Sequence, residues 1–272
     1  MAESINIKDR LRRVTSRQNA LVKEVRRAFA RGECTHDGYC AIESVRLIEE
    51  AIRSGLKFRA VLFSESAASK AARLLPQLGS HVETVVLPDD IFAGAVATES
   101  PQGVAALVKF KEHDLDAALR VPDALVVVVA GIQDPGNLGT IARSAEGFGA
   151  HAVLLGEGTV SLFNPKVVRA SAGSVFRVNM TAVELNATIA KLRGCGLRLV
   201  ATSSHRGTPL QEARLSGPLA LFIGNEGAGL PREILKEVDE TVMIPHSPKV
   251  ESLNAGVAAS ILLYEIARQR QK

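Results

Sequence analysis

Aromatic side chains and cysteine are scarce in this chain. Its 272 residues include no tryptophan, two tyrosines, nine phenylalanines and three cysteines. With so few rings, we do not expect nucleic-acid bases to stack extensively on aromatic platforms. The three cysteines, Cys34, Cys40 and Cys195, form neither a CxxC pair nor an even set, and the six histidines have no metal-ligand spacing. We therefore expect reduced thiols and no metal site.

Several other patterns are also missing. No apolar run is long enough to cross a bilayer, which predicts a soluble globular protein. Residues 1–6 do not begin a basic and then apolar leader, so we expect a cytoplasmic location. No GxxxxGK[ST] motif occurs, and this excludes a P-loop. Glycines 224, 227 and 229 do not have the GxGxxG spacing, which argues against an NAD-type oxidoreductase.

The length predicts two domains, and both have an α/β pattern. We expect a basic arm and a small βαβαβ domain over residues 1–110, a linker or connecting helix over 111–123, and a second domain over 124–272. In the first domain, helices are predicted at 43–54, 67–78 and 89–97, and strands at 58–64, 81–87 and 103–108.

The second domain opens with the continuous apolar run 124–132, which is typical of a strand buried in a parallel sheet. A loop is predicted at 133–139 and a helix at 140–149, with Arg143 pointing away from the apolar helix face. Further strands are predicted at 152–155, 198–202, 219–224 and 240–244. Helices are predicted at 165–172, 185–193, near 231 and at 254–270. Ligands of such parallel sheets bind beyond the carboxyl ends of the strands.

The first 31 residues hold most of the positive charge. They contain nine Lys or Arg against three acidic residues, a net charge of +6, which leaves −2 of the total +4 for the remainder. A solvated helix and a nucleic-acid contact are about equally good interpretations of such a run.

Three turns after apolar segments stand out in the second domain. They are Gln133–Gly139, Gly224–Gly229 and the segment Pro245–Leu253. Each turn taken alone has an ordinary structural explanation, and Ser252 could simply cap the last helix. Their convergence at strand ends favours a cofactor site.

The residues in these turns resemble a known family. Asp134-Pro-Gly-Asn-Leu-Gly-Thr-Ile-Ala-Arg143, Ile223-Gly-Asn-Glu-Gly-Ala-Gly-Leu230 and Ile244-Pro245 with Ser252-Leu-Asn254 are similar, in order and spacing, to the three motifs of the SpoU (TrmH-like) branch of the SPOUT RNA methyltransferases. Upstream, Arg17-Gln-Asn-Ala20, Ala41–Ala51 and Pro101-Gln-Gly103 resemble an L30e-like substrate-binding domain. Ser44 stands where that domain commonly has glycine, and Ala255-Gly256 stands where Val-Ser is usual.

The resemblance implies a function and an architecture. It implies transfer of a methyl group from S-adenosylmethionine to a ribose 2′-hydroxyl, with 23S rRNA favoured as the substrate. A tRNA 2′-O-methyltransferase and a non-catalytic RNA-binding protein are the alternatives. It further implies a parallel-sheet SPOUT domain with an α/β trefoil knot, and a homodimer whose interface borders the active site.

The resemblance also assigns roles to residues. Gly224, Ile244 and Leu253 are expected to bind the cofactor. Because a guanidinium stays protonated, Arg143 is expected to clamp phosphate and activate the hydroxyl electrostatically rather than act as a base. The catalytic set is expected to comprise Arg143, Asn137, Glu226, Ser252 and Asn254. RNA contacts are expected from Arg12, Arg13, Arg17, Lys23, Arg26, Arg27, Arg169 and Ser171.

Overall fold

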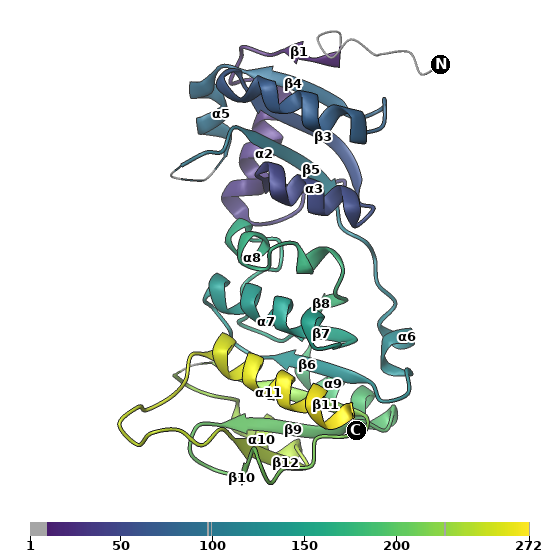
Figure 1. Ribbon diagram of the computed structural model, residues 1–272, viewed down its shortest axis with the longest axis vertical. Helices are drawn as coiled ribbons and strands as arrows, with labels where there is room; N and C mark the ends of the chain where they lie inside the picture. Colours follow the sequence, from purple (N-terminus) through teal and green to yellow (C-terminus); the bar gives the residue numbers. More distant parts are fainter. Residues whose placement is uncertain (1–9, 97, 99, 226, 272) are drawn as a thin grey trace. The chain divides into compact units, whose positions relative to one another are not determined.

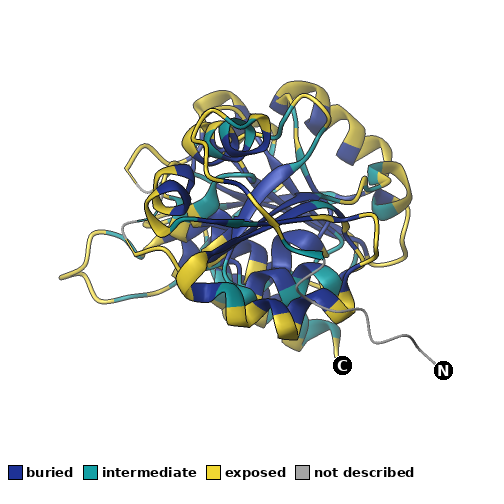
Figure 2. Cartoon of the chain, turned by 90° about the horizontal axis from the view of Figure 1, so that it is seen from above, coloured by how far each residue is buried: buried dark blue, intermediate teal, exposed yellow. Residues whose placement is uncertain are grey.

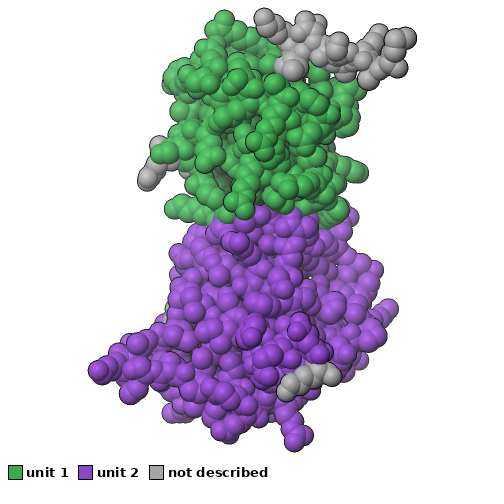
Figure 3. All heavy atoms as spheres, viewed as in Figure 1, with its two compact units in different colours: residues 1–111, 163–169 green, residues 112–162, 170–272 purple. Residues whose placement is uncertain are grey.

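The structure is a computed structural model that describes residues 10–96, 98, 100–225 and 227–271. The chain divides into two compact units (Figure 3). Unit 1 comprises residues 1–111 and 163–169, and unit 2 comprises residues 112–162 and 170–272. Each unit is built around its own sheet.

Unit 1 is a five-stranded mixed sheet with helices (Figure 1). The strand order is β1-β4-β3-β5-β2; β1, β4 and β3 are parallel, whereas β5 is antiparallel to both β3 and β2. The strands are β1 (Arg12–Arg13), β2 (Cys40–Glu43), β3 (Lys57–Ser64), β4 (Glu83–Leu87) and β5 (Val104–Lys109). The helices are α2 (Ala20–Arg31), α3 (Val45–Arg53), α4 (Ala71–Leu74) and α5 (Asp89–Ala95), with 3-10 turns at Glu65–Lys70 and Leu75–Gln77.

Helix α2 forms because the basic arm also carries a regular apolar stripe. Leu21, Val22, Val25, Ala28 and Phe29 are buried, and they pack with α5 against one face of the sheet. The Asn19 side chain accepts a hydrogen bond from the Leu21 amide and caps the start of the helix. Of the two interpretations of the arm, the helix is therefore present, and its basic face lies opposite the buried stripe.

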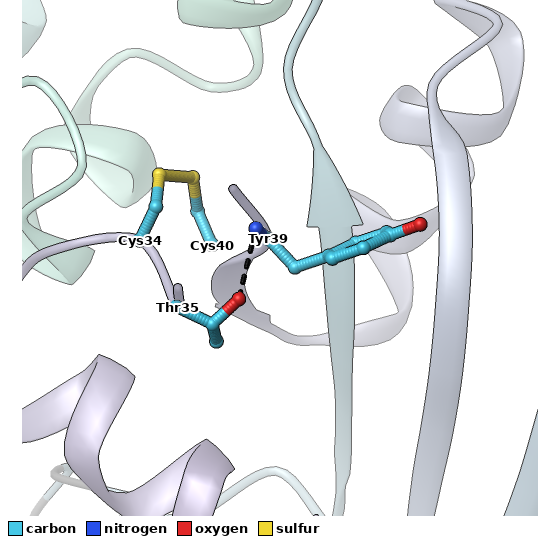
Figure 4. The surroundings of a disulfide bond; sticks show 4 residues. All are labelled: Cys34, Thr35, Tyr39 and Cys40. Carbon is cyan, nitrogen blue, oxygen red and sulfur yellow. Dashed lines mark hydrogen bonds between the residues drawn. A yellow bond between two sulfur atoms is a disulfide. The ribbon is translucent and has the colours of Figure 1, made fainter. Parts of the chain in front are cut away.

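A disulfide joins Cys34 to Cys40 and corrects the expectation that every thiol is reduced (Figure 4). The chain reverses between α2 and β2, and the Tyr39 amide donates to the Thr35 hydroxyl oxygen at 3.1 Å. This turn brings the two Cα atoms within 4.3 Å of each other. A spacing of six residues matches no redox or metal motif, so no sequence signal marked the pair. Cys195 is free and exposed.

Ser44 explains why a glycine is common at its position in similar domains. Its φ is +99°, a conformation that glycine adopts far more readily than serine. The serine hydroxyl instead accepts a hydrogen bond from the Leu47 amide at 3.2 Å and caps α3. Ser44 thus adopts the backbone conformation that glycine favours in the turn between β2 and α3.

Unit 2 contains a seven-stranded sheet in the order β10-β12-β9-β11-β6-β7-β8, and every pairing in it is parallel. The strands are β6 (Leu125–Val129), β7 (Ala152–Leu155), β8 (Met180–Ala182), β9 (Arg198–Ser203), β10 (Thr208–Pro209), β11 (Leu219–Ile223) and β12 (Glu240–Met243). The helices are α6 (Leu115–Leu119), α7 (Pro135–Gly147), α9 (Leu185–Gly194), α10 (Arg232–Glu237) and α11 (Ala255–Arg270), with a 3-10 turn at Ser174–Phe176. Helix α8 (Pro165–Ala170) belongs to unit 1 except for its last residue.

The central strands of this sheet are buried on both faces. Figure 2 shows that strands of the chain are largely dark blue, the colour of buried residues. Val126 and Val128 of β6 belong to a core cluster that also contains Ile189 and Leu192 of α9. Residues that alternate with the two valines point to the opposite face of the sheet and are buried as well. The continuous apolar run at 124–132 therefore correctly predicted a central parallel strand.

Helix α11 is fixed at both ends. At its start, Asn254 caps the helix by accepting from the Val257 amide. At its end, the Arg270 guanidinium donates to the carbonyl oxygens of Asp123 at 2.5 Å and Gly217 at 2.6 Å. Burial lowers the pKa of Arg270 from its ordinary value. Between these ends the Ser260 hydroxyl meets that of Ser144 on α7 at 2.7 Å.

Two local predictions differ from the structure. Helix α7 begins at Pro135 rather than at 140, because Asp134 caps it and proline suits the first helical position. The short strands β1, β2, β8 and β10 were not predicted. The segment expected as a linker or connecting helix contains α6, and residues 112–123 cluster with unit 2. The trefoil knot stays a prediction.

The described residues contain neither a membrane-spanning helix nor a metal cluster. No helix among them has the length and apolar character needed to span a membrane. In the same part of the chain, no group of three or more His, Cys, Asp or Glu side chains is placed to hold a metal ion.

Candidate cofactor site

A cavity of about 620 Å³ lies at the carboxyl edge of the unit 2 sheet. Its walls come from the segments that follow β9, β11 and β12 and from the first turns of α11. Much of the lining is apolar, including Ile223, Leu230, Val242 and Leu262. Its volume is that of a pocket for a small organic molecule. Three residues predicted to bind the cofactor, Gly224, Ile244 and Leu253, line this one cavity together with Ser252.

Gly224 allows the turn after β11 to fold tightly upon itself. A Cβ atom at this position would lie 2.3 Å from the Gly229 carbonyl carbon and 2.4 Å from the Leu230 nitrogen. Both neighbours are backbone atoms, so no side-chain rotation could relieve such a clash. Glycine is required here because the backbone closes on itself, and the same closure exposes the turn to the cavity.

Asn225 holds this turn in place. Its Oδ1 accepts hydrogen bonds from the amides of Gly227 at 2.9 Å and Ala228 at 3.1 Å. Its Nδ2 donates to the carbonyl oxygen of Gly131 at 2.8 Å. One side chain therefore shapes the turn after β11 and ties it to the segment that follows β6.

A second asparagine pair ties the first and third motifs together. Asn254 Nδ2 donates to Asn137 Oδ1 at 2.8 Å, across 117 positions of sequence. Asn137 is buried in the first turn of α7, and its amide donates to the capping Asp134 carboxylate at 2.8 Å. The starts of α7 and α11 are thus held side by side. The predicted convergence of the three turns is confirmed by these contacts.

The remaining predicted catalytic residues are less closely grouped. Arg143 lies on the exposed side of α7, as predicted, and does not line the cavity. Among the described residues, its guanidinium has no hydrogen bond or ion pair. Ser252 lines the cavity and does not cap α11, since Asn254 does so. Glu226 lies outside the described residues.

The predicted RNA-contacting residues separate into three groups. Arg12, Arg13 and Arg17 form ion pairs with Glu83, Glu65 and Asp90, the last two at 2.5 and 2.6 Å. Lys23 and Arg27 instead line an open cavity beside α2.

The other three have local partners. The Arg26 guanidinium donates to the Arg17 carbonyl oxygen at 3.5 Å. Arg169 lies 3.6 Å from the Glu43 carboxylate within unit 1. The Ser171 side chain is buried, so this conformation gives RNA no access to its hydroxyl.

The structure adds basic residues that the sequence motifs did not single out. His205 and Arg206, after β9, and His246, after β12, all line the main cavity. No motif marks them, because their segments are short loops of ordinary composition. Their positions just after predicted strands were the only available signal.

The fold and cavity define a class: a parallel-sheet α/β protein with a glycine-lined small-molecule site at the strand ends. Residues 124–264 match the SpoU rRNA methylase family, and residues 19–106 match the MRM3-like substrate binding domain. The chain therefore belongs to the SpoU rRNA methylase family, whose members use S-adenosylmethionine.

Similar proteins match nearly the whole chain. The 23S rRNA (guanosine(2553)-2′-O)-methyltransferase RlmP of Bacillus subtilis is 32% identical over 94% of this chain and 99% of its own. The 23S rRNA (uridine(2479)-2′-O)-methyltransferase of Streptomyces viridochromogenes is 33% identical over 95% and 93%. The structure of the SpoU methyltransferase AviRb from Streptomyces viridochromogenes, in complex with AdoMet, has a TM-score of 0.81 at 30% identity and covers 94% of this chain and 99% of its own.

The tight turn at Gly224 yields a test of the cavity. Gly224→Ala should lower the affinity for S-adenosylmethionine at least about tenfold, or about 1.4 kcal/mol, because the turn must shift. Isothermal titration calorimetry measures this change. Gly194→Ala is the matched control, since a Cβ atom there meets open space. Unchanged affinity in Gly224→Ala would show that the turn does not shape the site.

Proposed function

We propose that this protein transfers the methyl group of S-adenosylmethionine to a ribose 2′-hydroxyl of 23S rRNA. The observation that carries the proposal is the Asn137–Asn254 hydrogen bond beside a glycine-lined cavity. This bond brings the first and third family motifs together at the edge where the second motif forms the cavity wall. Similarity to two 23S rRNA 2′-O-methyltransferases supports the choice of substrate.

The cavity residues fit the cofactor. Gly224, Ile244 and Leu253 present backbone and small or apolar side chains, which suits an adenine ring and its hydrogen-bonding edge. S-adenosylmethionine supplies, when bound, a methyl group that is already activated. The protein therefore has to orient the ribose oxygen and favour loss of its proton.

Arg143 is the residue best suited to favour that loss. Its guanidinium is exposed and has no acidic partner among the described residues, so it is available to bind an RNA phosphate. A fixed positive charge next to the target ribose stabilises the developing alkoxide. Asn137 and Asn254 orient the adjoining helix starts, and Ser252 offers a hydroxyl to the substrate side of the cavity. Glu226 remains our proposal as the residue that accepts the proton or orients Arg143.

The proposal is tested with tritiated S-adenosylmethionine and 23S rRNA. The wild-type protein should label one ribose, and Arg143→Ala should transfer no measurable methyl group while its cofactor affinity stays within about threefold, a change of less than about 1 kcal/mol. Arg193→Ala, at an exposed arginine of α9, is the control and should label normally. Failure of the wild type to label RNA would refute the enzymatic role. Equal loss of cofactor binding in Arg143→Ala would refute the division of labour.

The RNA-binding surface of unit 1 is best assigned along α2. Lys23, Arg27 and Arg31 recur every four residues, so they share one face of the helix. They line a cavity of about 480 Å³, and among the described residues none of them is in an ion pair. Glu24 on the same helix is paired with Arg59. We thus assign phosphate contact to this stripe ahead of Arg12, Arg13 and Arg17, and keep Arg26 and Arg169 as secondary candidates.

This ranking predicts different effects for two triple variants. Lys23→Ala/Arg27→Ala/Arg31→Ala should weaken 23S rRNA binding and reduce the salt dependence by roughly 0.7–0.9 per lost phosphate contact. Arg12→Ala/Arg13→Ala/Arg17→Ala should have a smaller effect, because those arginines already have carboxylate partners. Filter binding across a salt series compares them. An equal or reversed order would show that the arm binds RNA through the paired arginines.

A homodimer is proposed to form through the exposed side of α11. Val257, Ile261 and Tyr264 are 48%, 36% and 56% exposed and recur at helical spacing. The Tyr264 ring also packs edge-to-face with the Phe148 ring of α7, and the two ring centroids are 5.9 Å apart. A row of large apolar side chains in contact with water is typical of an interface. This row begins one turn from Asn254, so a second copy would border the cofactor site.

Charge placed on this row should separate the subunits. Ile261→Asp/Tyr264→Asp should sediment as a monomer where the wild type sediments as a dimer, because two buried carboxylates per subunit cannot be paired. Val121→Asp, at a comparably exposed valine outside α11, should leave the dimer intact. A wild-type monomer, or a dimeric double variant, would exclude this interface.

The cytoplasm, where rRNA lies, remains the proposed location.

A further inference from the structure

The lining of the main cavity includes three basic side chains, here called the basic rim, as well as apolar ones. His205, Arg206 and His246 are the residues of the described lining that can carry positive charge, and no Asp or Glu is among that lining. The two imidazole rings come from different loops, and their centroids lie 6.2 Å apart. Two rings at this separation can both reach one small anion placed between them.

The loop that carries His205 and Arg206 is held at both ends. The Ser203 hydroxyl oxygen accepts from the amides of His205 at 3.4 Å and Arg206 at 3.2 Å. Gly207 has a φ of +112°, and a Cβ atom there would lie 2.2 Å from the Thr241 carbonyl oxygen. The loop therefore packs directly on the backbone of β12, which also leads to His246.

His246 has one ring nitrogen fixed and the other available. Its Nδ1 lies 2.7 Å from the Ile244 carbonyl oxygen. A carbonyl oxygen can only accept, so Nδ1 carries the hydrogen of this bond. Nε2 is left for a ligand. Because Ile244 also lines the cavity, this bond holds the imidazole next to the space that a bound molecule would fill.

At neutral pH, S-adenosylmethionine carries one anionic group, the carboxylate of its methionine portion, and two positive charges, the α-ammonium beside that carboxylate and the sulfonium. Cations at the rim repel the sulfonium and attract the carboxylate. They therefore favour the orientation in which the sulfonium and its methyl group lie away from the basic rim, toward uncharged lining residues such as Ser252. The apolar wall is left for adenine.

We propose that His205, Arg206 and His246 form the subsite for the cofactor carboxylate and thereby orient the sulfonium methyl toward the ribose. This inference rests on the proposed function, since it concerns the same cofactor. It assigns positioning roles to three residues that the quoted family motifs do not name. Charge-assisted hydrogen bonds of this kind discriminate strongly between ligands with and without the charged group.

Two ligands separate the subsite from the rest of the cavity. S-adenosylhomocysteine retains the carboxylate and cannot react, whereas 5′-methylthioadenosine lacks the whole amino-acid portion. His246→Asn keeps a donor near the Ile244 carbonyl oxygen and removes only the Nε2 position. His205→Ala/Arg206→Ala removes the other two groups.

Calorimetry on the full chain should show about a tenfold or greater loss of S-adenosylhomocysteine affinity in each variant, about 1.4 kcal/mol. Affinity for 5′-methylthioadenosine should change less than about twofold, or about 0.4 kcal/mol. Lys249→Ala is the control. Lys249 lines a neighbouring cavity of about 600 Å³, which His205 and His246 also line, but Lys249 does not line the main cavity. Its affinity for both ligands should be unchanged.

Three outcomes would overturn the inference. An equal loss of affinity for both ligands would mean that the variants damage the cavity as a whole. Unchanged affinity for both would mean that the basic residues do not touch the cofactor, and a simultaneous loss of 23S rRNA binding would assign them to RNA phosphate. Failure of the wild type to bind S-adenosylhomocysteine would instead refute the proposed function itself.

Discussion

The uniform direction of the strands in unit 2 is the constraint on which the site depends. Because all seven strands are parallel, each strand delivers its following loop to the same edge of the sheet. Segments far apart in the sequence thus meet without any special device. The two asparagine links, Asn225 to Gly131 and Asn254 to Asn137, then fix loops that the sheet has already gathered. The cavity is a product of topology first and of side-chain chemistry second.

The sequence predicted the second domain better than the first, and the reason is physical. Long apolar runs such as β6 and capped helices such as α11 are specified locally, so their patterns survive in any context. The mixed sheet of unit 1 is specified by pairings between distant segments. The antiparallel course of β5 and the short strands β1 and β2 leave little local signal.

The candidate site shows the same division. Gly224 and Asn254 were found because backbone closure and helix capping restrict residue type, and such restrictions are visible in a motif. The basic rim was missed because His205 and His246 come together only through the adjacency of β9 and β12. The net charge of the basic arm was also an incomplete guide to which of its residues can bind RNA. It could not reveal that Arg12, Arg13 and Arg17 have acidic partners from other elements, whereas the stripe on α2 lines an open cavity.

The two ends of α11 are fixed to different parts of unit 2, so the helix is a rigid connection between them. Its 16 residues span about 24 Å, from the Asn254–Asn137 contact to the carbonyls of Asp123 and Gly217 held by Arg270. A shift of the helix along its axis at one end would therefore also displace the residues at the other end. The placement of Asn254, a predicted catalytic residue at the start of the helix, is therefore set partly by Arg270 at the other end. Selection on catalytic geometry would act on Arg270 as well as on the residues that surround the cofactor.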